Sequence, residues 1–98
     1  MLEKDIVAAI LRYLKALPRC FAWKEHGGMY GTAGIPDIIA CVDGRFVALE
    51  VKAPKGKLTR LQEVTLGRIQ AANGSAHKVS SVAEVRQILR EEGFDHEV

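Results

Sequence analysis

Two acidic residues and a lysine in the middle of the chain have the types and spacing needed to hold a metal ion beside a phosphate. Asp37 opens one apolar run, Glu50 and Lys52 close the next, and Asp43-Gly44 stands between the runs. Asp-Gly is favoured in tight β-hairpins because both residues of such a turn take positive φ. A symmetric turn at this dipeptide places Asp37 directly opposite Glu50, with Cβ atoms about 5 Å apart.

The same turn decides which side chains share a face of the hairpin. It pairs Val42 with Arg45, and because side chains alternate along a strand, Lys52 falls on the face of Asp37 and Glu50. The opposite face is expected to be wholly apolar and to consist of Ile38, Ala40, Val42, Val47, Leu49 and Val51.

Carboxylates at this spacing can hold one divalent cation between them. Mg²⁺ takes few protein carboxylates, keeps several waters and binds substrate phosphate. The backbone carbonyl of Val51 could add a ligand, and Lys52 could orient or deprotonate a water or stabilise charge on the phosphate. The alternative is a surface salt bridge in an ordinary hairpin, which would bind no metal and would leave Lys52 without a catalytic role.

A basic cluster follows the hairpin directly. The segment 52–60 contains no acid and holds Lys52, Lys55, Lys57 and Arg60. A net charge of +2 does not by itself predict a nucleic-acid partner. Because the cluster lies next to the acids, however, we expect Lys55, Lys57 and Arg60 to bind phosphates that flank the reacting one. A solvated loop is the alternative.

Size and composition are those of an ordinary soluble globular protein, and we expect residues 1–98 to form one domain. No apolar run approaches the ~20 residues of a membrane helix. Glu3 and Asp5 make the N-terminus unlike a signal peptide. Cys20 and Cys41 lack metal-ligand spacing and are expected to be reduced core thiols of a cytosolic protein.

Hydrophobic periodicity and turn signals predict the order α-β-β-β-α-β-α. Helices are expected over 3–17, from near Arg60 to Ala72, and from a cap at Ser81; strands are expected over 20–24, 36–42, 45–52 and 77–80. A strand–helix–strand crossover is almost always right-handed, so the fourth strand should lie parallel to the third in a mixed sheet. The tail from Gly93 is expected to be frayed.

The segment 25–34 is a glycine-rich loop. Such a loop could bind phosphate. However, the Lys-Ser/Thr of a phosphate-binding P-loop does not follow, and Gly34 leads into Pro36 and a strand rather than a helix. A plain connection and a loop that orders on a polymer substrate remain the two interpretations. The histidines at 26, 77 and 96 do not form a group.

Two further polar residues allow two interpretations each. Glu3 is either a first-turn acid that complements the helix dipole or a third carboxylate directed at the site. Thr59 and Gln62 have the spacing of a capping box.

Pro36-Asp37 followed by Glu50-Val51-Lys52 resembles the PD-(D/E)xK nuclease superfamily. The fuller pattern resembles its VRR-NUC branch, small phage and bacterial nucleases similar to the catalytic domain of the Fanconi-anaemia-associated nuclease. The matching motifs are Gly34-Ile35-Pro36-Asp37, Asp43-Gly44-Arg45, Glu50-Val51-Lys52, Gly56-Lys57-Leu58-Thr59 and Gln62.

The resemblance implies a restriction-endonuclease-like α-β-β-β-α-β core, here with an extra C-terminal helix, and hydrolysis of DNA phosphodiesters with Mg²⁺ or Mn²⁺. It assigns Asp37 and Glu50 to the metal and Lys52 to catalysis. It makes Glu3 the first-helix acid, bound to the metal directly or through water. It gives Gln62 a role in supporting the site or contacting DNA, besides its role in the capping box.

The resemblance also implies a branched DNA substrate, in particular a four-way Holliday junction, cut by a homodimer in the bacterial or phage-infected cytoplasm at the nucleoid. No nucleotide cofactor and no membrane are implied. Lys24 and Tyr30 are further candidate DNA contacts. The alternatives are a flap- or nick-directed repair nuclease and a catalytically silent DNA-binding module. The silent module predicts loss of Asp37, Glu50 or Lys52, and all three are present.

Overall fold

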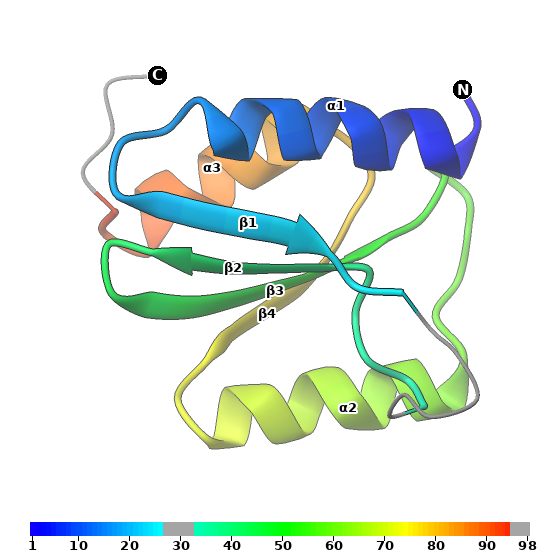
Figure 1. The fold of residues 1–98 in the computed structure, drawn as a ribbon. Coiled ribbons are helices and arrows are strands. Elements are labelled where there is room, and N and C mark those ends of the chain that lie inside the picture. Colours follow the sequence, from blue (N-terminus) through cyan, green and yellow to red (C-terminus); the bar gives the residue numbers. More distant parts are fainter. Residues whose placement is uncertain (27–32, 95–98) are drawn as a thin grey trace.

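A computed structural model describes residues 1–26 and 33–94 as a four-stranded sheet between two layers of helices (Figure 1). The helices α1 and α3 lie on one face of the sheet and α2 on the other (Figure 1). This arrangement confirms the predicted α/β class, element order and mixed sheet. In chain order the elements are α1 (Glu3–Lys15), β1 (Cys20–Lys24), β2 (Ile38–Val42), β3 (Arg45–Val51), α2 (Arg60–Ala71), β4 (Ser75–Val79) and α3 (Val82–Glu91).

The strands lie in the order β1-β2-β3-β4, and only β3 and β4 are parallel. The hairpin has the predicted register, with Val42 opposite Arg45. Asp43 and Gly44 take the φ angles of +52° and +81° that a tight turn of this kind requires. Continuing the same register one residue beyond the end of β2 sets Asp37 opposite Glu50.

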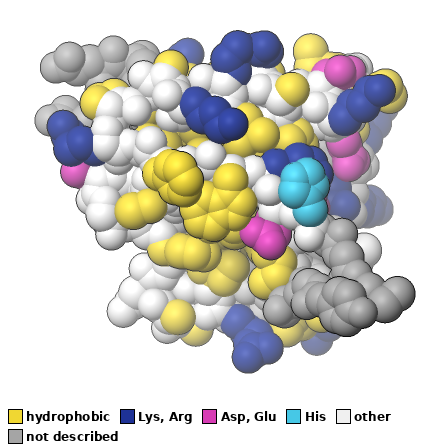
Figure 2. All heavy atoms as spheres, viewed as in Figure 1, with side chains coloured by type: hydrophobic (Ala, Val, Ile, Leu, Met, Phe, Trp, Pro, Cys, Tyr) yellow, Lys and Arg dark blue, Asp and Glu magenta, His cyan; other side chains and the backbone are white. Residues whose placement is uncertain are grey.

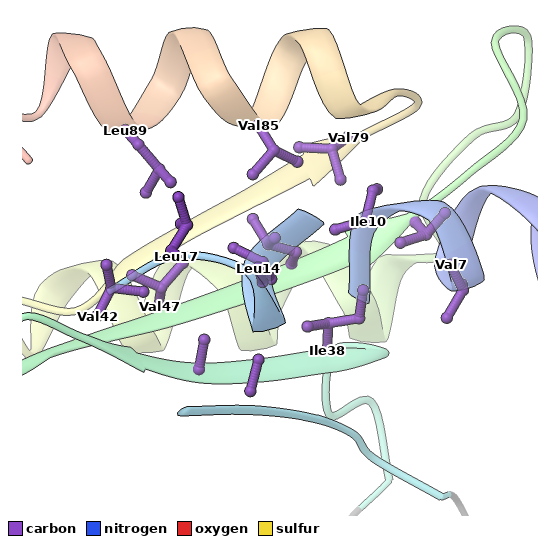
Figure 3. Packing of buried hydrophobic residues seen from close by; sticks show 14 of the residues in the cluster. Val7, Ile10, Leu14, Leu17, Ile38, Val42, Val47, Val79, Val85 and Leu89 are labelled. Carbon is purple, nitrogen blue, oxygen red and sulfur yellow. The ribbon is translucent and has the colours of Figure 1, made fainter. Parts of the chain in front are cut away.

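The two faces of the hairpin bury different sets of side chains. The side covered by α1 and α3 is the main core, and Figure 3 shows Ile10 and Leu14 of α1 and Val85 and Leu89 of α3 packed over the sheet. The apolar face predicted for the hairpin lies in this core. A smaller core under α2 contains Ile39, Ala48, Leu66 and Ala76.

Three element boundaries differ from the predicted ones by two residues each. The first helix ends at Lys15 rather than at residue 17, because the residue before Pro18 is sterically biased away from the helical region. The strand β2 starts at Ile38 rather than at residue 36, and β4 starts at Ser75 rather than at residue 77. β4 begins early because Ala76 is completely buried on the sheet face under α2.

The C-terminal segment is not frayed at Phe94, which corrects the predicted tail. The Phe94 side chain is 4% exposed, and its N–H donates to the carbonyl of Leu89 at 2.9 Å. The Arg45 guanidinium lies 3.5 Å from the ring centre, and its Nη1 donates to the carbonyl of Glu92. An apolar side chain just after a helix end therefore closes the core here. Residues 95–98 lie outside the described residues.

The prediction of two core thiols is wrong for Cys41. Both cysteines are free, but Cys41 is exposed and Cys20 is half-buried. Burial, followed by the nearby Cys41, raises the pKa of the Cys20 thiol. Cys41 lies on the α2 face of β2, and α2 packs mainly against β4, so this part of the sheet is left open.

Within residues 1–26 and 33–94, every helix is too short or too polar to cross a membrane.

Candidate active site

The hairpin brings Asp37 and Glu50 together at the end of the sheet farthest from the turn. Asp37 precedes β2, and its Oδ2 accepts a hydrogen bond from the N–H of Val51 at 2.8 Å. Glu50 lies within β3 on the face towards α2 and is only 4% exposed. The Asp37 carboxyl is thus fixed by a hydrogen bond from β3, and the Glu50 carboxyl is buried.

The first turn of α2 supports Glu50. The side-chain Nε2 of Gln62 donates to Glu50 Oε2 at 3.2 Å. The same amide uses its Oε1 to accept the N–H of Thr59, and Thr59 Oγ1 accepts the N–H of Gln62, which completes the predicted capping box. Gln62 therefore contacts the site and caps the helix at the same time.

Lys52 lies beside the acids. Its Nζ is 3.8 Å from Glu50 Oε2, and its side chain is only 15% exposed. Gly56 packs tightly against this lysine, since a Cβ at that position would lie 3.1 Å from the Cβ of Lys52 and 3.1 Å from the carbonyl oxygen of Ala53. The glycine lets the loop after β3 fold back closely enough to confine the lysine.

A second glycine holds the segment before Asp37 against α2. Gly34 has a φ of +81°, and a Cβ there would lie 2.7 Å from Leu61 Cγ and 2.8 Å from Thr65 Oγ1. Both the backbone conformation and the close approach exclude a larger residue. This contact fixes the path of the chain into Asp37.

The environment of Glu50 favours its neutral form. Burial is the main cause, and a hydrogen bond with the Asp37 carboxyl, the charge of Asp37 and the more distant charge of Glu3 act in the same direction. Lys52 opposes them, and the result is a pKa of about 8 for Glu50. At neutral pH the Glu50 carboxyl is therefore mostly protonated in the metal-free protein.

Glu3, at the start of α1, reaches the strand that ends at this site. Its Oε2 accepts from the N–H of Ala53 at 3.3 Å. Its side chain is exposed, and its charge contributes to the raised pKa of Glu50. The helix therefore directs this acid towards the predicted site, and its role as a metal ligand stays a prediction.

The two central carboxyls fit a hard divalent cation. Asp37 and Glu50 supply oxygen ligands, and a bound cation would offset the repulsion between their negative charges. In the described part of the chain, three or more His, Cys, Asp or Glu side chains nowhere gather closely enough to form a metal site. The protein ligands would thus be few, and the carbonyl of Val51 stays a predicted additional one.

The predicted DNA contacts fall into three groups. Lys55, Lys57 and Arg60 are exposed in the loop after β3 and at the start of α2, where they follow Lys52 (Figure 1). Lys24 pairs with Ile38, whose side chain lies in the main core, so Lys24 points to the opposite face of the sheet from the acids. Tyr30 lies outside the described residues.

Glu25 is a neighbour of the site that the sequence interpretation missed. Its backbone N–H donates to the carbonyl of Asp37 at 2.7 Å, and its Oε2 accepts from the indole Nε1–H of Trp23 at 3.0 Å. The signal was present in the pairing of the first two strands, because one further step along their register sets Glu25 opposite Asp37.

Comparisons with known proteins agree with this architecture. The sequence matches no protein-family model and no curated protein. A solved structure described as a "VRR_NUC domain" superposes with a TM-score of 0.76 and covers 93% of this chain and 96% of that one, at 22% sequence identity. The chain therefore has the fold of a VRR_NUC domain, as its motifs predicted.

Proposed function

We propose that this chain is a divalent-metal-dependent nuclease that hydrolyses DNA phosphodiesters. The observation that carries the proposal is the juxtaposition of Asp37 and Glu50, with Lys52 Nζ 3.8 Å from Glu50, at one end of a VRR_NUC fold. A surface salt bridge would not require a carboxyl that is 4% exposed and holds a proton at neutral pH.

Asp37 and Glu50 would hold Mg²⁺ or Mn²⁺, with Glu3, directly or through water, and the Val51 carbonyl as further ligands. When bound, the cation would supply positive charge beside the phosphodiester. Gln62 keeps a hydrogen bond on Glu50 and so fixes the direction of that carboxylate.

Lys52 would act on the reacting phosphate. Its side chain is largely buried, and its ammonium is close enough to the acids to orient the attacking water or to stabilise negative charge on the phosphoryl oxygens. Lys55, Lys57 and Arg60 would bind phosphates on either side of the cut.

We further propose that the substrate is branched DNA, in particular a four-way junction, and that the active form is a homodimer. A two-fold dimer presents two equivalent sites, which matches the symmetry of a junction with two strands to cut. Such an enzyme would act at the nucleoid in the cytoplasm of a bacterium or of a phage-infected cell. Sedimentation that finds only monomer, with and without DNA, would rule out the dimer.

The first experiment is cleavage of a labelled four-way junction with Mg²⁺, with Mn²⁺ and with EDTA. We expect metal-dependent cutting that is lost in Glu50→Ala and Lys52→Ala and kept in Arg90→Ala, which removes an exposed arginine from α3 on the opposite face of the sheet. Paired symmetric nicks indicate a junction resolvase, whereas cuts confined to flap or nick substrates indicate the repair-nuclease alternative.

A second readout does not depend on cleavage. Mg²⁺ should raise the Tm of the wild-type protein, since binding to the native state stabilises it, and should not raise the Tm of Glu50→Ala. Binding of the junction without cutting under either metal would indicate the silent DNA-binding module instead.

A further inference from the structure

Two exposed aromatic side chains lie on the same face of the sheet as the acids. Phe21 and Trp23 of β1 are 70% and 39% exposed, and their ring centres are 5.5 Å apart with the planes tilted by 46°. They belong to the part of the sheet that α2 leaves open. Figure 2, viewed from the side of β1, shows a continuous group of hydrophobic side chains in this region.

The register of β1 and β2 fixes the distance of these rings from the site. Trp23 is opposite Ile39, which shares a face with Asp37 and lies two residues along β2 from it. Two residues of strand span about 7 Å. Phe21 is opposite Cys41 and lies about 14 Å along the same line. The aromatic pair therefore extends directly away from the catalytic acids.

Trp23 is also held in a fixed orientation. Its Nε1–H donates to Glu25 Oε2 at 3.0 Å, and the Glu25 N–H donates to the Asp37 carbonyl at 2.7 Å. The polar atom of the indole is thus satisfied within the protein, while the ring remains accessible. The same backbone segment positions both the ring and the acid.

Positive charge lies on the other side of the acids. The exposed cluster of Lys55, Lys57 and Arg60 follows β3, whereas the aromatic rings lie towards the middle of β1. A polyanion bound by this cluster and crossing the acids would run onto the rings. Because Trp23 is only about 7 Å along the sheet from Asp37, it lies within one or two nucleotides of the reacting phosphate.

We propose that Trp23, supported by Phe21, is a stacking platform for an unpaired DNA base on one side of the scissile phosphate. This inference rests on the proposed nuclease function and specifies its substrate further. A base within a continuous duplex cannot stack on a side chain, so the platform selects DNA whose bases are open near the cut, as at a branch point or a flap. Stacking of this kind tolerates any sequence, because every base has a π-face.

The test uses the fact that Trp23 is the single tryptophan of the chain. Intrinsic fluorescence is titrated without metal, in a Glu50→Gln background, with an oligo-dT single strand and with a fully paired two-stranded duplex. We expect quenching by the single strand and little change with the duplex. By anisotropy of a labelled strand, Trp23→Ala should bind about tenfold more weakly, while Trp23→Phe should stay within about threefold of the parent.

A matched control separates stacking from charge. Lys57→Ala should weaken binding of the single strand but leave the quenching at saturation unchanged. Because Trp23→Ala could fold poorly, its urea midpoint is measured as well, and Phe21→Ala, which keeps the fluorophore, repeats the affinity measurement.

Two outcomes would overturn the platform. One is an absence of quenching together with unchanged affinity in Trp23→Ala and Phe21→Ala. The other is a dimer that becomes monomeric when both rings are removed, with unchanged binding of the single strand, which would make this face a subunit interface. Normal cleavage by Trp23→Ala, together with no quenching in the Glu50→Gln protein that keeps Trp23, would reject the platform and leave the nuclease function intact. Quenching in the Glu50→Gln protein together with no cleavage by the wild-type protein would support the platform and reject the nuclease function.

Discussion

Glu50 is the one charged side chain within residues 1–26 and 33–94 that is buried, and its position has a thermodynamic cost. Burying a carboxylate is unfavourable unless hydrogen bonds and opposite charge compensate for the lost hydration. Gln62 and Lys52 compensate in part, but the neighbouring Asp37 adds repulsion, so the carboxyl retains its proton. Such an arrangement lowers the stability of the ligand-free protein and is typical of a ligand-binding site.

Glu50→Gln should stabilise the apo protein, and the gain should grow with pH. The ordinary pKa of 4.5 applies in the unfolded chain and about 8 in the folded one. Below pH 4.5 both states hold the proton, so the raised pKa costs nothing. Between pH 4.5 and 8 only the unfolded chain loses it, and the wild-type free energy of unfolding falls. Urea unfolding in EDTA should show a gain on the order of 4 kcal/mol at pH 8 and little at pH 4.5.

The control for this titration is Glu91→Gln, which removes an exposed acid at the end of α3. Its effect should stay within about 0.5 kcal/mol at every pH. If the two variants showed the same pH profile, the raised pKa of Glu50 would be contradicted.

At the scale of elements, the start of α2 and the site are built from the same side chain. Gln62 accepts the N–H of Thr59 through one atom of its amide and donates to Glu50 through the other. The capping box that the sequence predicted is therefore also a support for Glu50. Shifting the start of this helix by one residue would remove both.

Thr59→Ala and Gln62→Ala should separate the two roles. Each variant loses part of the cap, so each should lower the free energy of unfolding by about 1 kcal/mol. Only Gln62→Ala leaves Glu50 without its amide partner, so only that variant should lose about tenfold in kcat. The measurement is urea unfolding combined with single-turnover cleavage; equal losses of kcat in the two variants would make the glutamine a capping residue alone.

Turn chemistry and hydrophobic periodicity predicted most of the helices and strands and the meeting of Asp37 with Glu50. The turn at Asp43-Gly44 fixed the register by counting, and with it the meeting of Asp37 and Glu50. The rest depended on where α2 packs over the sheet, which no short segment encodes. For that reason the exposure of Cys41 was missed, and the burial of Phe94 depended on contacts with α3 and the hairpin turn.

At the scale of the whole molecule, the acids lie between a basic loop and an open apolar surface. α2 packs mainly against β4, so β1 and the part of β2 at Cys41 keep an uncovered face near the site. The overall charge is only +2, and any attraction for DNA must therefore come from how the charges are distributed.

Removing the basic cluster should change how DNA binding depends on salt. The triple variant of Lys55, Lys57 and Arg60 to alanine should flatten the slope of log K against log salt by about 2 to 3, since each lost phosphate contact contributes roughly 0.9. The measurement is duplex binding in EDTA between roughly 50 and 200 mM salt, a range in which such slopes are measured.

The charge-matched control replaces Lys15, Arg68 and Arg90, which are exposed and lie outside the cluster. It removes the same three charges and should keep most of the slope. An equal loss in both triple variants would mean that the net charge, and not the cluster, attracts DNA.

The two ends of the described chain lie at opposite ends of the sheet (Figure 1). Glu3 reaches Ala53 beside the acids, whereas Phe94 is clamped by Arg45 at the hairpin turn. A fluorescent protein or an immobilising tag joined ahead of α1 would therefore crowd the approach to Asp37 and Glu50. The same cargo attached behind α3 would stand clear of it, which makes the C-terminal side the attachment point for tethering this protein to a surface or to another module.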